Sequence, residues 1–310
     1  MPRRTRFTHP IAVDTWDAHF RWRIGNDLRE HTIDETWARV ARAAARREGR
    51  NSDEWPGRYA AAFRDWRLLP DERLLAHAGT ARAVLPLGAP VAVLNASVFV
   101  LDPHTARARF DAEGFAETAA LAVRFLDDAS CDSLLACCEP QDLRVGMLGV
   151  AGALSQLGVP YGCVDAVRQG AAMASALAQG CLQGTVALAS ERGARGNAPL
   201  GELAAAWSSR GMPPSLIDAA QKFGVRHARL TAIEPHALLA RLANNASDGL
   251  DPMGTAPDLI EGHRAYPMWT SGAGNAREAH SAMQRAVQPW IDIEIDACTD
   301  SMQQALARSS

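Results

Sequence analysis

One segment constrains the fold of this chain more than any other: residues 164–192 form a long, Ala-rich stretch. Its composition predicts a single long helix that ends at Gly193. Gly170, Gly180 and Gly184 interrupt it, and each glycine inside a helix costs about 1 kcal/mol relative to alanine. We therefore expect this helix to depend on tertiary packing against close neighbours.

Helical spacing of apolar residues recurs along most of the chain, whereas β-branched residues cluster in few places. The helical pattern predicts helices over residues 32–47, 55–66, 70–79, 111–128, 143–157, 199–209, 214–223 and 275–288. Strands are predicted around residues 91–100, 229–233 and 291–296. An irregular segment is expected over residues 7–31, and a loop rich in Gly, Pro and Ser over residues 254–274. The predicted class is mainly α with a few strands, an α+β fold.

Composition narrows the classes of partner. The 310 residues contain 32 basic and 35 acidic side chains, a formal net charge of -3, so no positive field favours nucleic acid as a partner. No run of 18 apolar residues occurs, and we expect no membrane partner. No apolar segment follows the basic residues 1–6, and none of the six cysteines forms a CxxC pair. These features predict a cytoplasmic protein with free thiols. Lysine chemistry could use only Lys222, the single lysine.

Most motifs that identify an enzyme are missing. The sequence has no GxGxxG, no GxxxxGK[ST] and no HExxH. His227 and His236 have no acidic or thiol pattern nearby, so no metal site is predicted. Asp127 and Asp128 are predicted to form a solvated helix end, with general acid–base work as the disfavoured alternative.

Eight stretches carry a more specific signal. They are residues 10–20 with 32–44, 66–80, 102–111 with 125–127, 145–161 (VGMLGVAGALSQLGVPY), 187–193, 229–235, 247–252 and 283–295. In this collinear order they resemble the large subunit of ribonucleotide reductases, and most closely the adenosylcobalamin-dependent class.

The resemblance has consequences for the fold. It implies an N-terminal helical segment over residues 1–80, and over residues 81–310 a truncated, mostly helical remnant of the family's ten-stranded α/β barrel. With so few strands the barrel cannot close, and its exposed edges must be covered by helices or paired with another chain. A homodimer is therefore one expected assembly.

The resemblance also shows what is absent. The family generates a thiyl radical on a cysteine in an Asn-Pro-Cys-Gly-Glu loop and reduces it with two further cysteines on flanking strands. This loop motif does not occur here, and no cysteine precedes Cys131. Asn95 matches a family strand that a redox cysteine should precede, but no cysteine stands there. We therefore assign no catalytic residue.

The family's phosphate-binding loop corresponds to Glu234, Pro235, His236, Ala237 and Leu238. In the family this loop reads Pro-Thr-Gly-Thr-Ile-Ser, and here its hydroxyl groups and its glycine are gone. Backbone N–H groups at the start of a helix could still bind a phosphate. The alternative is an ordinary helix start with His236 in its first turn.

These features together predict a reductase-like protein that is not catalytic by itself. By similarity it would be called a vitamin B12-dependent ribonucleoside-diphosphate reductase, although the radical and redox cysteines are absent. The expected role is that of a companion or regulatory partner of an intact ribonucleotide reductase in deoxyribonucleotide synthesis. The alternatives are a residual nucleotide- or cobalamin-binding protein, with adenosylcobalamin implied by the resemblance alone, and a decayed reductase without activity.

Overall fold

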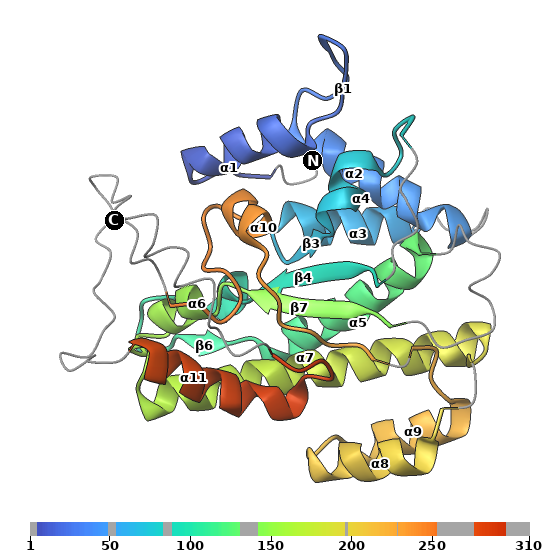
Figure 1. The fold of residues 1–310 in the computed structure, drawn as a ribbon, viewed down its shortest axis with the longest axis vertical. Coiled ribbons are helices and arrows are strands. Elements are labelled where there is room, and N and C mark those ends of the chain that lie inside the picture. The colour runs from blue at the N-terminus through green and yellow to red at the C-terminus, as the bar shows by residue number, and fades with distance from the viewer. Residues whose placement is uncertain are drawn as a thin grey trace.

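A computed structural model describes residues 5–48, 54–82, 89–130, 142–195, 198–227, 229–252 and 276–295. Helices dominate these residues, and a small sheet lies between the N-terminal helices and the long helix α7 (Figure 1). The predicted class, mainly α with a few strands, is confirmed. No helix in the described ranges combines the length and the apolar character needed to cross a membrane.

The N-terminal elements form one side of the molecule. They are α1 (Pro10–Thr15), a π-helix (Trp16–Phe20), the hairpin β1 (Arg23–Ile24) and β2 (Asp27–Leu28), α2 (Ile33–Ala44), a 3-10 turn (Ala45–Glu48), α3 (Glu54–Arg64), β3 (Leu68–Pro70) and α4 (Glu72–His77). Thr32 begins α2 with a capping box, in which its side chain accepts from the backbone of Glu35 and the Glu35 carboxylate accepts from the backbone of Thr32. This sequence signature explains why the start of α2 could be predicted.

The central sheet has three strands in the order β3-β4-β7. Strand β4 (Val91–Asn95) pairs antiparallel with β3 and parallel with β7 (Arg144–Leu148). An isolated parallel bridge joins Val145 of β7 to Thr231. The parallel order β4-β7-Thr231 therefore continues beyond the regular sheet.

Two long helices lie against this sheet (Figure 1). Helix α5 (Ala112–Ala129) packs along α7 (Val164–Arg192). A Cβ atom at Gly180 would lie 2.1 Å from the carbonyl oxygen of Ala116, and one at Gly184 would lie 2.8 Å from that of Ala120. The glycines that weaken α7 intrinsically let the backbone of α5 approach it, which confirms the expected close neighbour.

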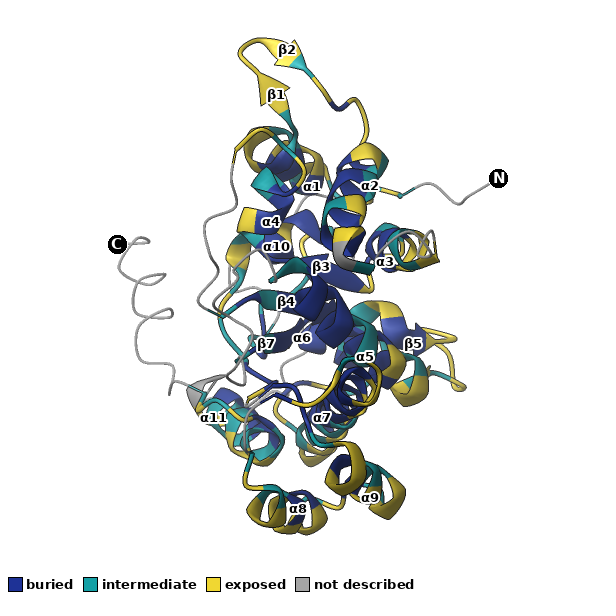
Figure 2. Ribbon diagram, turned by 90° about the vertical axis from the view of Figure 1, so that its right-hand side faces the viewer, coloured by how far each residue is buried: buried dark blue, intermediate teal, exposed yellow. Residues whose placement is uncertain are grey.

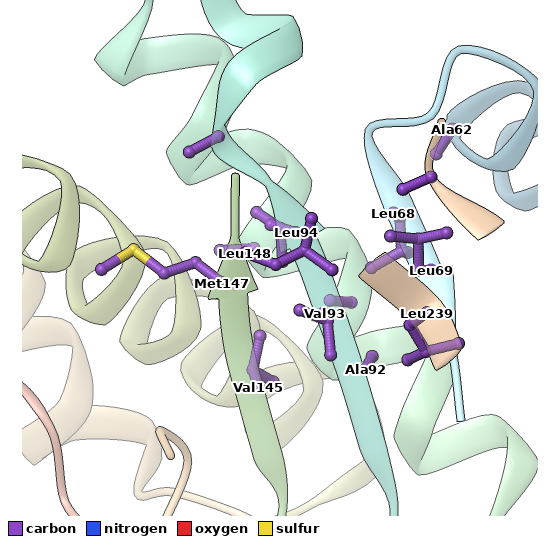
Figure 3. Packing of buried hydrophobic residues seen from close by; sticks show 14 of the residues in the cluster. Ala62, Leu68, Leu69, Ala92, Val93, Leu94, Val145, Met147, Leu148 and Leu239 are labelled. Carbon is purple, nitrogen blue, oxygen red and sulfur yellow. The ribbon is translucent and has the colours of Figure 1, made fainter. Parts of the chain in front are cut away.

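The buried core is continuous through the sheet (Figure 3). Its strand residues include Leu68, Leu69, Val93, Leu94, Met147 and Leu148, all nearly or fully buried. Tyr59 and Phe63 of α3 stack edge-on against Phe125 of α5, each with ring centroids 5.3 Å apart. Residues of both predicted segments, 1–80 and 81–310, therefore pack into the same apolar core.

The remaining elements complete the periphery. They are a 3-10 turn (Ala96–Phe99), β5 (Val100–Leu101), β6 (Arg109–Phe110), α6 (Val150–Gln156), α8 (Leu200–Ser209), α9 (Pro214–Phe223), α10 (Ala237–Leu242), α11 (Ala276–Val287) and a 3-10 turn (Gln288–Trp290). Helices α8 and α9 lie at the end of the molecule opposite the β1–β2 hairpin (Figure 2). They bury a second, smaller cluster against Ala178, Leu182 and Val186 of α7.

One predicted helix is wrong in its first half. Residues 143–157 were expected to be helical throughout, but 144–148 form the central strand β7 and only α6 is helical. Gly149 separates the two with a left-handed backbone (φ 76°). A short apolar run does not distinguish a buried strand from a buried helix, and pairing with β4 decides it.

The predicted strands are shorter or irregular. The strand expected over 91–100 ends at Asn95, where a 3-10 turn intervenes. No strand forms among the described residues of 229–233 and 291–295. There the Asp292 carboxylate accepts from the backbone of Leu230 (2.9 Å) and Thr231 (3.2 Å), so a side chain replaces part of a strand ladder. The predicted loop over 254–274 lies outside the described residues.

Candidate functional site

The predicted site residues meet at one edge of the sheet. Because β4 and β7 are parallel, with Asn95 opposite Leu148, their carboxyl ends lie together. The bridge from Val145 to Thr231 is also parallel, so the chain reaches Glu234 at the same edge. Ligands of open parallel sheets bind outside such carboxyl ends. The structure thus brings Asn95 and the 234–238 loop to the edge where a site would form.

The Asn95 side chain forms its hydrogen bonds within the turn that follows β4. It is buried, and its Oδ1 accepts hydrogen bonds from Ser97 N (3.2 Å) and Ser97 Oγ (2.7 Å). A Cβ atom at Gly149 would lie 2.4 Å from this oxygen, so only glycine fits beside it. The Asn95 side chain therefore ends β4 and caps the following 3-10 turn.

The 234–238 loop starts helix α10 with a carboxylate already in place. The backbone N–H of His236 donates to both carboxylate oxygens of Asp248, at 2.8 and 3.0 Å. Glu234 forms an ion pair with Arg144. Pro235 and Ala237 are exposed, and Leu238 is half-buried. Asp248 thus occupies the position at the helix start where a phosphate oxygen would accept.

The electrostatics of this loop are acidic. Burial raises the pKa of Asp248, and the neighbouring Asp251 and Glu72 raise it further against the opposing His236 N–H. Burial lowers the pKa of His236, whereas Asp248 and Glu234 oppose that shift. A phosphate would add negative charge among these carboxylates. The geometry therefore favours the ordinary helix start over phosphate binding.

A buried contact beside the loop was not predicted. Tyr161 Oη donates to the carbonyl oxygen of Leu250 (2.7 Å) and lies 3.3 Å from His280 Nδ1. His280 Nε2 lies 3.7 Å from Asp251. These contacts join α11 to the 247–252 loop. They connect residues 119 positions apart, a separation at which a sequence pattern carries no signal.

The prediction for Asp127 and Asp128 was wrong. Both side chains are fully buried, not solvated, at the end of α5. Asp127 lies 2.6 Å from Arg192, 3.2 Å from Arg226 and 3.3 Å from His227. Burial alone would raise the pKa of Asp127, but the hydrogen bond from His227 and the charge of Arg226 hold it well below the ordinary value.

Asp128 extends this buried network toward the N-terminal helices. Tyr59 donates to Asp128 Oδ2, and Arg192 reaches both Asp128 and Glu48. Arg124 also pairs with Glu48. The network links α3, α5 and α7 to the 3-10 turn after α2. We define these residues as the buried ion network: Glu48, Tyr59, Arg124, Asp127, Asp128, Arg192, Arg195, Arg226 and His227.

Neither His227 nor the two thiols in the described ranges form a reactive site. His227 lies between Asp127 and the Thr185 hydroxyl, 3.0 Å from Nδ1. Cys181 is fully buried in α7, where burial raises its pKa, and Cys163 caps the start of α7. Within the described residues, no group of three or more His, Cys, Asp or Glu is arranged to hold a metal ion.

Comparison with known families settles what this sheet is part of. The family model described as the ribonucleotide reductase barrel domain matches residues 89–256, just over half of the chain. The chain belongs to the ribonucleotide reductase barrel family. The matched range includes β4, β7, α5, α7 and α10, so the sheet edge at Asn95 lies within the part of the chain that matches the barrel domain. A search of curated proteins finds no significant match to the chain.

The sequence resemblance implies adenosylcobalamin, and the described residues at this edge do not fit its chemistry. The thiols that the described ranges contain, Cys163 and Cys181, lie on α7 and not at the carboxyl ends of β4 and β7. Those strands end in Leu94-Asn95 and Met147-Leu148. Among the described residues, no thiol lies at these strand ends from which a cobalamin-derived radical could take a hydrogen atom.

Proposed function

We propose that this reductase-family protein does not reduce ribonucleotides by itself and acts as a companion of an intact ribonucleoside-diphosphate reductase in deoxyribonucleotide synthesis. One observation carries the proposal. The sheet edge that would hold the chemistry is occupied by Asn95 in its own turn and by Asp248 at the start of α10.

The chemical argument concerns sulfur. Radical reduction of a ribose needs a thiol that loses a hydrogen atom next to the sugar. Cys181 is fully buried in α7, where burial raises its pKa, which disfavours both access and the thiolate. Residual nucleotide binding at the 234–238 loop is disfavoured for the separate reason that carboxylates surround it.

The argument for a companion role concerns what is retained. A single core joins the N-terminal helices to the sheet, and the buried ion network is highly paired. Unpaired buried charges would strongly destabilise the fold, so these paired interactions favour a folded protein. A chain that keeps the reductase framework without its chemistry can act through its surface. The sequence resemblance favours a partner of the adenosylcobalamin-dependent class.

Two measurements test the two halves of the proposal. The purified protein, assayed with a ribonucleoside diphosphate, adenosylcobalamin and a dithiol, is expected to form no deoxyribonucleotide, and turnover would overturn the claim of lost catalysis. Sedimentation of the protein mixed at micromolar concentration with the intact reductase of the same cell is expected to show a complex. Independent sedimentation of the two proteins would overturn the companion role, and the protein alone serves as the control for a homodimer.

A further inference from the structure

A cavity of about 350 Å³ lies between the β1–β2 hairpin and helix α2, away from the sheet edge. Its lining includes Trp22, Arg29, Arg39, Arg42, Arg46 and Gly79. We propose that this cavity binds a small phosphate-bearing molecule. We call it the arginine pocket.

The hairpin supplies one wall of the arginine pocket. The N–H of Arg29 donates to the carbonyl oxygen of Trp22 at 3.0 Å, which extends the β1–β2 pairing of Arg23 with Leu28 by one position. Residues directly opposite in an antiparallel pair project from the same face. The Trp22 ring and the Arg29 guanidinium are therefore neighbours on the hairpin. Figure 2 shows this hairpin projecting from the body beside α2.

Helix α2 and the turn after it supply the other wall. Arg39 and Arg42 lie three residues apart on one face of α2. Arg46 lies in the 3-10 turn that follows, and all three line the same cavity. Arg42 and Arg46 are both exposed and line the same cavity, so a bound anion would reduce the repulsion between these like charges. Gly79 closes the base with a left-handed backbone, where a Cβ atom would lie 2.9 Å from the Arg39 side chain.

At the floor of the pocket, the charged groups of Arg39 and Glu30 are already hydrogen-bonded to each other and to neighbouring residues. Arg39 Nε donates to Glu30 Oε1 at 2.7 Å, and its other nitrogens reach the carbonyl oxygens of Ala78 (2.6 Å) and Leu75 (2.9 Å). The second oxygen of Glu30 accepts from Trp22 N and the Thr36 hydroxyl. This buried pair is rigid and neutral, so it neither attracts nor repels an anion strongly.

Glu35, the other acidic residue of the lining, is also hydrogen-bonded within the protein. Glu35 Oε2 accepts from the backbone N–H groups of His31 (2.5 Å) and Thr32 (3.1 Å) at the start of α2. By contrast, no carboxylate in the described part of the chain pairs with Arg29, Arg42 or Arg46. With four arginines against two glutamates in the lining, the pocket carries a net positive charge.

The residue types indicate the class of ligand. Guanidinium groups bind phosphate oxygens in pairs through parallel N–H bonds. Three of them line this cavity, one from the segment after β2, one from α2 and one from the turn after α2. The volume is at the lower end for small-molecule sites, which fits a phosphorylated metabolite rather than a macromolecule. Trp22 adds a flat ring against which an apolar or aromatic part of such a ligand can lie.

Calorimetric titration of the full-length protein with inorganic pyrophosphate and with ATP tests the arginine pocket. Both probes are expected to bind, and ATP more tightly if the Trp22 ring contributes. The double variant Arg42→Gln with Arg46→Gln is expected to lose affinity by about tenfold or more. The double variant Arg107→Gln with Arg109→Gln removes two exposed arginines near β6 and is expected to bind as the unaltered protein does.

Three results would overturn the proposal. They are no binding by the unaltered protein, equal loss in both double variants, or the same heat from sodium chloride at matched ionic strength. If the double variant does not melt cooperatively, Arg29→Gln on the hairpin replaces it, because this residue is exposed and lies outside α2. Unchanged affinity of Arg29→Gln would then count against the pocket.

Discussion

Tyr59 Oη donates a hydrogen bond to Asp128 Oδ2 across 2.5 Å, although the two residues are 69 positions apart. This contact fixes α3 against the end of α5. Asp128 Oδ1 lies 2.9 Å from Arg192 Nη1, yet it makes no well-directed hydrogen bond. Burial raises the pKa of Asp128 to about 6, and the charge of Glu48 contributes to the increase. The relationship makes the fold sensitive to pH at one identifiable carboxyl group.

The first prediction concerns Asp128→Asn. The pKa of about 6 in the folded protein exceeds the ordinary 3.8, so the folded state retains a proton that the unfolded chain releases. This contribution to stability is present below about pH 4 and is lost as the pH rises through about 6. Asparagine removes the titration. The free energy of unfolding of the unaltered protein, relative to the variant, should fall by about 2–3 kcal/mol from about pH 4 to about pH 7.

Denaturant unfolding of both proteins across this pH range provides the measurement. Asp127 is present in both proteins, and its pKa is shifted downward, so its contribution largely cancels in the comparison. A stability difference that does not change with pH would contradict the assignment of the retained proton to Asp128.

The second prediction concerns Asp127→Ala. Removal of this carboxylate breaks the buried ion pairs that it makes with Arg192 and Arg226. Breaking a buried ion pair from one side typically costs about 3–5 kcal/mol, and we expect a loss of that size in the free energy of unfolding. The matched control is Asp165→Ala, whose pair with Arg168 is more than two-thirds exposed and should change stability by less than about 1 kcal/mol. Similar effects of the two variants would show that the network contributes little.

The third prediction concerns Gly180→Ala in α7. Alanine favours a helix by about 1 kcal/mol, but its Cβ atom would overlap the Ala116 carbonyl oxygen of α5. We expect net destabilisation of about 1–3 kcal/mol. Gly201→Ala in α8 provides the control, since nothing lies within 4 Å of its Cβ position, and it should be neutral or stabilising. Thermal unfolding of both variants measures the contrast, and stabilisation by Gly180→Ala would contradict the close helix contact.

The fourth prediction concerns Asp292→Ala. Its carboxylate accepts from Leu230 N and Thr231 N, and hydrogen bonds to a charged group contribute about 1.5–3 kcal/mol. We expect a loss in that range, with faster amide exchange at both positions. Glu294→Ala, an exposed acidic residue two positions away, should leave exchange at Leu230 and Thr231 unchanged. Equal exchange in the two variants would argue against the carboxylate clamp.

Local signals predicted the helices well where the pattern was long. The bounds of α7 agree with the prediction. Its helical pattern extends over 29 residues and ends at Gly193, and a stretch of that length is too long for a strand. The shorter helices α8 and α9 were also predicted, with Pro214 indicating the start of α9. Residues 144–148 failed because a short apolar run suits either state until β4 pairs with it.

The candidate site was predicted in part. Family resemblance indicated Asn95 and the 234–238 loop, and the parallel sheet brings them to one edge. It did not indicate Asp248 at the start of α10. The arginine pocket was also missed. Its walls come from the hairpin, α2 and Gly79, and no local sequence pattern indicates that these segments lie close together in space.

The amino-acid sequence by itself determined the helical class, the long glycine-bearing helix and the membership of a reductase family. These depend on local periodicity and on the order of motifs along the chain, and both can be read without the tertiary structure. Only the tertiary structure decided that Asp127 and Asp128 are buried and paired, that Gly180 admits the backbone of α5, and that carboxylates surround His236. Burial and charge pairing depend on residues tens of positions apart, and folding alone brings those residues together.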